Sequence, residues 1–320
     1  MTTRVACIGT GTVGRAWAIV FARGGQEVAL YDTDRSQVTR ALTLLETTLE
    51  QLADSGWLNE PPETVRARIH VADSLTSAVS NARHIQESVR EDLALKQSVA
   101  AEIATHAPAD AVIASSTSAL PGSKFLADII EPGRALVAHP VNPPSLIPLV
   151  ELCGTGLTAP DTMEATRRFM QGLGMKPVIL RREIDGFLLN RLQYTLVAEA
   201  LHLVGEGYCT ATDIDRVMTE GLALRWLSIG PFTTAHLNAS EGFSGFVKQL
   251  GPMMRRIGQT AKTDYAWDDE LVARIHDDLV RDIPVEQIEA WQAWRDGRIL
   301  AARRTQSEGT SDQPETSTPD

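Results

Sequence analysis

Residues Arg4–Asp34 of this chain, RVACIGTGTVGRAWAIVFARGGQEVALYDTD, decide its fold. Apolar residues 5–8 predict a short buried strand, and the apolar spacing over 16–21 predicts a helix that a Gly-Gly pair ends. A second strand is predicted over 28–31. A strand, a glycine-rich turn, a helix and a strand in this order form the first unit of a parallel, doubly wound sheet.

The turn of this unit carries glycines spaced as G-x-G-x-x-G. Gly9 allows a tight turn, Gly11 lets the backbone approach a pyrophosphate, and Gly14 lets the helix pack close to the strand. Asp32 ends the second strand, where a carboxylate bonds a ribose 2′-hydroxyl and repels a 2′-phosphate. A plain strand-to-helix turn is the alternative, but the flanking elements favour NAD. The predicted NAD-binding residues are Gly9, Gly11, Thr12, Val13, Gly14 and Asp32.

Strands and helices continue to alternate as far as residue 180. The further predicted strands lie at 69–72, 84–88, 112–115, 135–138, 149–152 and 177–180, and helices lie at 37–52 and 63–68. From residue 184 the apolar pattern is helical almost without strand signals. We therefore predict an α/β protein, with an N-terminal Rossmann-type doubly wound sheet followed by an all-helical C-terminal domain. The predicted domains are 1–183 and 184–304, followed by a disordered acidic tail over 305–320.

Charge and cysteine content narrow the class of partner. The 320 residues carry a formal charge of −11, whereas nucleic acids and anionic membranes are bound through clustered Lys and Arg, so neither is expected as a partner. Three widely spaced cysteines argue against a disulfide framework and a CxxC metal site, and no metal is predicted. The amino terminus has no signal-peptide pattern. We expect a soluble cytoplasmic protein that acts on a small molecule.

Polar residues follow several predicted strands, at the edge where an open parallel sheet binds its ligand. They include Glu91 and Lys96 in HIQESVREDLALK, Ser118 in ASSTSAL, and His139 and Asn142 in AHPVNPP. Without the sheet, the serine run would be an ordinary turn. We interpret these residues as candidates for cofactor and substrate binding, with Asn142 among the substrate contacts.

His139 and Glu151 stand where two predicted strands would bring them together. Oxidation of an alcohol by NAD requires a base for the hydroxyl proton, and neutral imidazole suits that task near pH 7. A carboxylate beside it fixes the tautomer and stabilises the imidazolium. The alternative is a core histidine that donates to a backbone carbonyl. The predicted nicotinamide site nearby favours the catalytic interpretation.

Seven separated motifs, in order from about residue 4 to about residue 300, resemble the 3-hydroxyacyl-CoA dehydrogenase superfamily and, within it, the lambda-crystallin group. They are GTGTVGRAWA, HIQESVREDLALK, SSTSAL, AHPVNPP, PLVEL, GFLLNRLQY and GLALRWLSIGP. The resemblance implies an NAD-dependent dehydrogenase whose helical domain contributes to the substrate site and forms a homodimer.

The resemblance also implies a role for individual residues. Ser118 would hold the substrate hydroxyl, His139 would be the base, and Glu151 would be its partner. Asn190 would bond the substrate or the nicotinamide end of the site, although an amide in an apolar helix is more often an interhelical hydrogen-bonder. The residues that would line the NAD pocket are Asp32, Glu91 and Lys96.

The chain departs from the acyl-CoA members of this superfamily in three places. Their catalytic histidine is followed by aromatic residues, whereas His139 is followed by Pro-Val-Asn-Pro. They carry a lysine-bearing arm near the CoA phosphates, whereas residues 41–60 contain four acids and no Lys or Arg. We expect this wall of negative charge to repel a polyanionic CoA. Arg225 stands where they have an uncharged segment, and it would hold a substrate carboxylate. Alternatively, Arg225 is a solvated surface ion-pair residue.

Three functions follow from these observations. The leading hypothesis is NAD-dependent oxidation of the 3-hydroxyl of a small hydroxy acid such as L-gulonate, with His139 as general base. The second is a short-chain 3-hydroxyacyl-CoA dehydrogenase that acts on 3-hydroxybutyryl-CoA. The third is a non-catalytic, crystallin-like structural protein that binds NAD. The presence of Ser118, His139, Glu151 and Asn190 together argues against the third.

Overall fold

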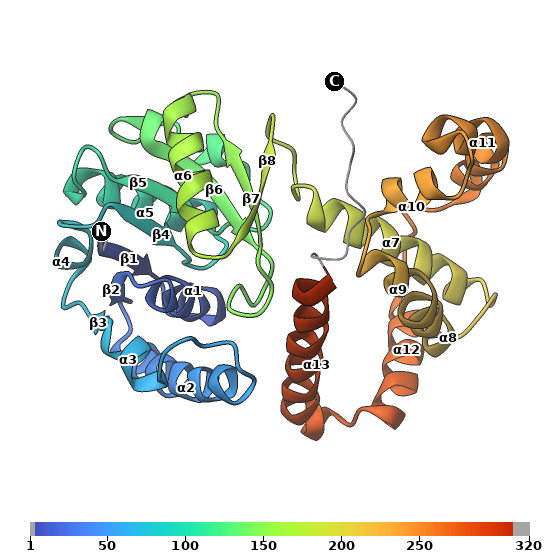
Figure 1. The fold of residues 1–320 in the computed structure, drawn as a ribbon, viewed down its shortest axis with the longest axis horizontal. Coiled ribbons are helices and arrows are strands. Elements are labelled where there is room, and N and C mark those ends of the chain that lie inside the picture. The colour runs from blue at the N-terminus through green and yellow to red at the C-terminus, as the bar shows by residue number, and fades with distance from the viewer. Residues whose placement is uncertain (1–3, 310–320) are drawn as a thin grey trace. The chain divides into compact units, whose positions relative to one another are not determined.

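The computed structural model describes residues 4–309 of the chain, which divides into two compact units (Figure 1). Unit 1 extends to Arg191 and unit 2 begins at Leu192. Unit 1 contains an eight-stranded sheet, whereas the described residues of unit 2 form helices and loops without a strand. The predicted fold class, a Rossmann-type sheet followed by an all-helical domain, is therefore confirmed.

The strands of unit 1 form one sheet in the order β3-β2-β1-β4-β5-β6-β7-β8. Their bounds are β1 Arg4–Ile8, β2 Glu27–Tyr31, β3 Ile69–Val71, β4 His84–Glu87, β5 Val112–Ser115, β6 Ala135–Pro140, β7 Leu149–Gly154 and β8 Lys176–Leu180. All eight predicted strands are present within two residues of their predicted ends. Pairing is parallel from β3 to β6, and β7 then runs antiparallel to β6 with β8 parallel to β7. The strand order reverses between β1 and β4, and open parallel sheets bind their ligands at the carboxyl ends of the strands at such a point.

Helices cover both faces of this sheet. Their bounds are α1 Thr12–Arg23, α2 Arg35–Asp54, α3 Pro62–Ala67, α4 Leu75–Val79, α5 Leu93–His106 and α6 Pro160–Gly172, with short 3-10 turns η1 Gly122–Lys124 and η2 Pro132–Arg134. Side-chain caps fix several starts: Asp34 accepts from Ser36 N, and Asp92 accepts from Leu95 N. The predicted helices over 37–52 and 63–68 correspond to α2 and α3.

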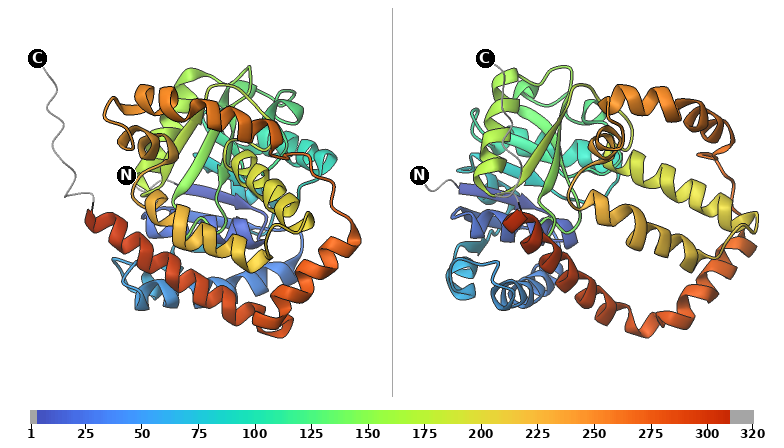
Figure 2. Two further views of the ribbon diagram at one scale, coloured as in Figure 1. Left: turned by 90° about the vertical axis from the view of Figure 1, so that its right-hand side faces the viewer. Right: turned by 45° about the vertical axis from the view of Figure 1, so that its right-hand side comes forward.

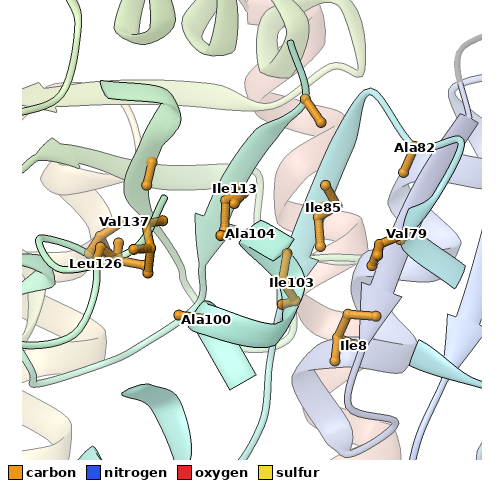
Figure 3. Close-up of a cluster of buried hydrophobic side chains, with 14 of the residues drawn as sticks. Ile8, Val79, Ala82, Ile85, Ala100, Ile103, Ala104, Ile113, Leu126 and Val137 are labelled. Carbon is orange, nitrogen blue, oxygen red and sulfur yellow. The ribbon is translucent and has the colours of Figure 1, made fainter. Parts of the chain in front are cut away.

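The core between the sheet and the helices α4 and α5 is apolar (Figure 3). Ile8, Ile85 and Ile113 project from three neighbouring strands and pack against Val79 of α4 and Ile103 of α5. None of these side chains is more than 2% exposed, so each contributes close to its full burial free energy. This packing fixes the strand ends that carry the polar residues of the candidate site.

The other face of the sheet is built from aromatic rings. Phe21 of α1 stacks on Trp17 at 5.3 Å and on Phe169 of α6 at 6.0 Å, so α1 and α6 lie on the same face. His84 of β4 lies against Phe21 and Phe169. Burial lowers the pKa of His84 to about 4, and Gln86 bonds its Nε2. His84 is therefore a neutral core imidazole near pH 7.

Unit 2 consists of helices that expose much apolar surface. Their bounds are α7 Leu189–Gly205, α8 Ala211–Arg216, the π-helical segment η3 Val217–Leu222, α9 Ala223–Trp226, α10 Pro231–Leu237, α11 Gly242–Thr260, α12 Asp269–Asp282, η4 Val285–Gln287 and α13 Ile288–Gly309. Thr210 forms a capping box with Asp213 at the start of α8. In both views of Figure 2, α12 and α13 are joined at one end only and diverge from the turn between them.

The two compact units divide after Arg191, a few residues beyond the domain boundary predicted at residue 183. The connecting segment folds back on unit 1, because Phe187 is fully buried there and Leu188 N and Leu189 N donate to Glu151. The first residues of α7 therefore belong to unit 1.

The predicted disordered tail begins too early. Residues 305–309 continue α13, and Gln306 Nε2 donates to Leu227 O at 2.6 Å, so disorder is the wrong prediction for them. Residues 310–320 of the predicted tail lie outside the described residues. Among the helices that the structure describes, none has the length and apolar character needed to cross a bilayer.

Candidate functional site

The three glycines of the first turn have three different reasons to be glycine. Gly9 has φ 96°, and a Cβ there would lie 2.7 Å from Ser88 O. A Cβ on Gly14 would overlap the carbonyl oxygen of Gly9, so the helix α1 packs directly on the turn. A Cβ on Gly11 would meet nothing within 4 Å. Two glycines are thus required by packing, and the third leaves open space where the backbone can approach a phosphate.

Thr12 and Val13 form the amino terminus of α1 beside this space, where free backbone N–H groups favour an anion. Thr12 is exposed and Val13 is half-buried. Their predicted position at the pyrophosphate is therefore compatible with the geometry of the turn.

Asp32 lies at the end of β2, and its carboxylate is held in place by the turn. Thr10 donates twice to Asp32 Oδ2, from its backbone N at 2.8 Å and from its hydroxyl at 3.0 Å. Asp34 N donates to the other oxygen, Oδ1, at 3.1 Å. A carboxylate oxygen accepts about two hydrogen bonds, so Oδ1 retains acceptor capacity for a ribose hydroxyl. The nearby cation Arg35 is paired with Asp73 at 3.1 Å.

Lys96 does not face solvent, because its side chain is only 1% exposed. Its ammonium donates to Glu87 Oε1 at 2.9 Å and to Val89 O at 3.3 Å, and it lies 3.5 Å from Glu91 Oε2. Ser115 donates to the second oxygen of Glu87. Lys96 is therefore the counter-ion of two carboxylates, of which Glu91 is the one nearer to solvent.

Glu91 in turn holds the loop that presents Ser118. One oxygen of Glu91 accepts from the Thr117 hydroxyl and from the backbone N–H groups of Ser118, Ala119 and Leu120. Burial alone would raise the pKa of Glu91, but hydrogen bonding by Thr117 and the charge of Lys96 lower it below its usual value. Ionised Glu91 therefore connects the predicted cofactor pocket with the predicted substrate serine.

Ser118 and Asn190 lie beside each other. Asn190 Nδ2 donates to the backbone oxygen of Ser118 at 2.8 Å. The Ser118 side chain is exposed, and among the described residues its hydroxyl has no hydrogen-bond partner. The sequence places these residues 72 positions apart, and the loop after β5 and the first turn of α7 bring them together.

His139 and Glu151 are directly opposite each other on the antiparallel strands β6 and β7. His139 Nδ1 and Glu151 Oε2 are 2.8 Å apart, and the two side chains are 4% and 2% exposed. The structure thus brings together the pair that the sequence predicted to meet.

The two oxygens of Glu151 have separate tasks. Oε2 faces His139, while Oε1 accepts from Leu188 N at 2.8 Å and Leu189 N at 3.1 Å. Burial alone would raise the pKa of Glu151, but the hydrogen bonds from His139 and from the two backbone amides outweigh it and lower the pKa. The carboxylate therefore stays ionised beside the imidazole. Nε2 of His139 has no partner among the described residues and is free to accept a proton.

Two further predicted substrate residues lie on the surface of their units. Asn142 is exposed in the loop between β6 and β7. Arg225 is exposed on α9 of unit 2, and no ion pair of Arg225 occurs among the residues that the structure describes. The role of both in substrate binding stays a prediction.

The predicted wall of negative charge over residues 41–60 is in fact partly neutralised. Glu46 pairs with Arg66 at 3.0 Å, and Glu60 pairs with Arg68, whose Nη2 donates to it at 2.8 Å. The compensating cations lie outside residues 41–60, because Arg66 is on α3 and Arg68 follows it. Repulsion of a polyanionic CoA is correspondingly weaker than predicted.

Sequence reasoning missed Thr10 and Phe187, and it assigned no role to Glu87 and Thr117. Thr10 could have been found as the hydroxyl nearest to Asp32 across the glycine turn, because parallel strands β1 and β2 end side by side. Glu87 is the last residue of β4 and Thr117 lies two residues after β5, so both share the strand-end signal of their neighbours. Phe187 gave no signal, because its importance depends on a backbone conformation.

Comparison with known proteins matches both parts of the chain. The family model described as "3-hydroxyacyl-CoA dehydrogenase, NAD binding domain" matches residues 4–184, and that of the "3-hydroxyacyl-CoA dehydrogenase, C-terminal domain" matches residues 186–274. The lambda-crystallin homolog of Bos taurus is 40% identical over 300 residues, which cover 92% of this chain and 93% of the relative. The L-carnitine dehydrogenase of Streptomyces griseus is 38% identical over 252 residues, covering 78% of this chain and 74% of the relative.

Among solved structures, the NAD⁺-dependent dismutase 5-formyl-3-hydroxy-2-methylpyridine 4-carboxylic acid 5-dehydrogenase is similar with a TM-score of 0.79 at 26% identity. The match covers 96% of this chain and 99% of that one. The predicted family resemblance and the predicted NAD cofactor are confirmed by these matches.

Proposed function

The chain belongs to the 3-hydroxyacyl-CoA dehydrogenase family of NAD-dependent oxidoreductases, and on that premise we propose that it oxidises the 3-hydroxyl group of a small free hydroxy acid, L-gulonate or a similar compound, with His139 as the general base. The observation that carries the proposal is the buried pair of His139 and Glu151, whose outer nitrogen Nε2 has no partner among the described residues.

The pair is suited to removing the proton of a secondary alcohol. Glu151 holds the proton of His139 on Nδ1, which leaves the lone pair of Nε2 available. When His139 takes the hydroxyl proton, the ionised Glu151 stabilises the imidazolium 2.8 Å away. NAD, when bound, accepts the hydride from the same substrate carbon.

The proposed substrate contacts surround the reacting hydroxyl. The free hydroxyl of Ser118 would hold the substrate oxygen, while Asn190 fixes the Ser118 backbone and keeps its own carbonyl oxygen for a ligand. Asn142 and Arg225 would bind further along the substrate, with the guanidinium holding the carboxylate through two parallel hydrogen bonds.

The cofactor residues follow from the glycine turn and its neighbours. The open space at Gly11 and the amino terminus of α1, at Thr12 and Val13, would hold the pyrophosphate, and Asp32 would hold the adenosine ribose. Glu91 would face the nicotinamide end of the cofactor. Lys96 would not contact the cofactor. As a buried cation beside Glu91, it would keep Glu91 charged and in place.

A free hydroxy acid is favoured by Arg225 and by relatives named for L-carnitine, which is itself a 3-hydroxy acid with a free carboxylate. The alternative substrate is 3-hydroxybutyryl-CoA. It is favoured by the pairing of Glu46 and Glu60 with arginines, which weakens the electrostatic repulsion of CoA beside α2. A non-catalytic role is the third candidate, and it would leave the geometry of the dyad without a use.

We propose further that the protein is a cytoplasmic homodimer formed through unit 2. Phe232 and Leu192 of this unit are 76% and 73% exposed, and burying such side chains against a second copy would stabilise both. The three cysteines are unpaired, as expected in a reducing compartment.

The test of the reaction is turnover of NAD with L-gulonate, L-carnitine, 3-hydroxybutyrate and 3-hydroxybutyryl-CoA under one set of conditions. We expect at least one free hydroxy acid to exceed 3-hydroxybutyryl-CoA in kcat/KM. A higher kcat/KM for the thioester than for every free acid would assign the chain to the acyl-CoA reaction. Absence of turnover with all four, in protein that binds NAD, would favour the structural role.

A further inference from the structure

The turn that leads into α7 contains two consecutive residues in the left-handed region. Gly186 has φ 73° and Phe187 has φ 51°. Glycine adopts this conformation without steric cost, whereas the Cβ of phenylalanine then crowds its own backbone. Phe187 is nevertheless one of the largest fully buried side chains of the described residues. A strained backbone at a buried aromatic residue persists only where its surroundings hold it.

The left-handed turn directs two backbone N–H groups at Glu151. Leu188 N and Leu189 N, which follow Phe187 immediately, both donate to Glu151 Oε1. The turn is closed on its other side by Phe187 N, which donates to Ile184 O at 3.1 Å. An extended conformation at Phe187 would carry both amides away from the carboxylate. The backbone of Phe187 therefore sets the hydrogen bonds that help to keep Glu151 ionised.

The ring of the same residue lies against the imidazole. The centroids of Phe187 and His139 are 5.1 Å apart, with an angle of 30° between the planes. Phe187 also belongs to the hydrophobic core cluster that contains Val137 and Cys153, on the strands that carry the dyad. The ring is thus packed between the core and one face of His139, where it limits rotation of the imidazole and keeps water from it.

We propose that Phe187 is a positioning residue for the proposed catalytic dyad, acting on both members at once. Its backbone aims two amides at Glu151, and its ring fixes the plane of His139, so that Nε2 points to the substrate side. The inference rests on the proposed role of His139 as general base. It explains why a phenylalanine is found at a conformation in which glycine would be less strained.

The test compares Phe187→Leu with Phe21→Leu. Both changes remove a fully buried ring from unit 1, but Phe21 contacts Trp17, His84 and Phe169 and not the dyad. We expect Phe187→Leu to lower kcat by roughly 10- to 100-fold, because a misplacement of about 1 Å costs on that order, and to leave the NAD dissociation constant within about twofold. The acidic limb of the pH profile of kcat/KM should shift in Phe187→Leu and stay in place in Phe21→Leu.

A double variant separates positioning from a general structural role. Added to His139→Gln, Phe187→Leu should lower the residual kcat no further, because its effect acts through His139. If Phe187→Leu binds NAD and keeps the wild-type kcat and pH profile, the inference is overturned. It is also overturned if Phe187→Leu lowers the kcat of His139→Gln by as much as it lowers the wild-type kcat. If Phe187→Leu does not bind NAD, Phe187→Met, whose longer and more flexible side chain adapts better to the space, is measured in its place. Full activity of His139→Gln would instead refute the proposed base itself.

Discussion

Unit 1 and unit 2 differ in where their apolar side chains lie. Unit 1 buries most apolar residues of its strands, although Val71, Val178 and Ile179 are exposed. The buried ionisable groups of its candidate site, His139, Glu151, Glu87 and Lys96, are paired. In the described part of unit 2 only five apolar residues are buried, namely Ala198, Val204, Ala235, Leu271 and Leu300. Several large ones are at least 60% exposed, namely Leu192, Tyr194, Tyr208, Val217, Phe232, Leu237 and Trp294.

This difference separates two kinds of stability. Unit 1 has a packed core and pairs the buried ionisable groups of its candidate site, so the chemistry can be set inside one chain. Unit 2 leaves apolar area that water disfavours by about 25 cal/mol per Å², and such area is ordinarily covered by another surface. Changes in unit 1 should therefore act on turnover and folding, and changes in unit 2 on substrate binding and association.

The largest expected effect tests whether unit 1 carries the chemistry. His139→Gln should lower kcat on the order of 10²- to 10⁴-fold, as loss of a general base does, while NAD affinity stays within about twofold. Steady-state turnover and NAD titration measure the two quantities. Retention of full activity across the pH range would place the chemistry elsewhere.

A second prediction asks whether unit 2 contributes to the substrate site. Arg225→Met should raise KM for the free hydroxy acid about 10²-fold, equivalent to roughly 3 kcal/mol of charge-assisted bonding, with little change in NAD affinity. Arg216→Met, an exposed arginine on the neighbouring helix α8, is the matched control. An unchanged KM in Arg225→Met would restrict unit 2 to association.

A third prediction uses the buried imidazole of unit 1. His84 is neutral in the folded protein down to about pH 4, whereas the unfolded chain takes up this proton near pH 6.5. The unfolded state therefore binds more protons between these values, and stability falls as the pH falls through this window, by on the order of 3 kcal/mol. His84→Gln should lose correspondingly less stability between pH 7 and pH 4 in urea unfolding. His276 is exposed on α12, and His276→Gln should keep the wild-type dependence of unfolding free energy on pH. An equal dependence in the wild type, His84→Gln and His276→Gln would refute the assignment of this effect to His84.

A fourth prediction concerns the exposed surface of unit 2. Phe232→Glu should weaken self-association by roughly 30-fold, about 2 kcal/mol, if this side chain is buried against a second copy. Gln249→Glu adds the same charge at an exposed position of α11 and should have little effect. Sedimentation equilibrium measures both, and a monomeric wild-type protein would contradict the proposed dimer.

The smallest effect sharpens the description of the cofactor end of unit 1. Thr10→Val should weaken NAD binding by roughly fivefold, since it removes one neutral hydrogen bond of about 1 kcal/mol to Asp32. Thr10→Ser, which keeps the hydroxyl, should retain the wild-type affinity for NAD. Because the fixed carboxylate also repels a 2′-phosphate, the preference for NAD over NADP should narrow in Thr10→Val and more so in Asp32→Ala. If Thr10→Val lost affinity for NAD and for NADP equally, Thr10 would only support the fold.

The sequence predicted unit 1 far more closely than unit 2. Strand bounds, the glycine turn and the meeting of His139 with Glu151 followed from apolar runs and turn chemistry, which are local signals. The contacts of Thr10 and Lys96 did not follow, because they depend on which strands are neighbours. The left-handed backbone of Phe187 could not be predicted either, since phenylalanine disfavours it and only the tertiary contacts select it. In unit 2 the helices were expected, but helical periodicity does not tell which apolar face remains uncovered.

The cross-strand position of His139 and Glu151 has a consequence for how the site tolerates change. Because the two residues are register partners on antiparallel strands, their meeting depends on the alignment of β6 with β7 and not on the length of the loop that joins them. Residues added between 141 and 148 would enlarge that loop and leave the alignment intact. A single deletion inside β7, by contrast, would turn Glu151 to the opposite face of the sheet, because side chains alternate along a strand. Homologues with a longer or shorter loop between β6 and β7 can therefore keep the dyad, whereas a register shift of one residue in β7 removes it.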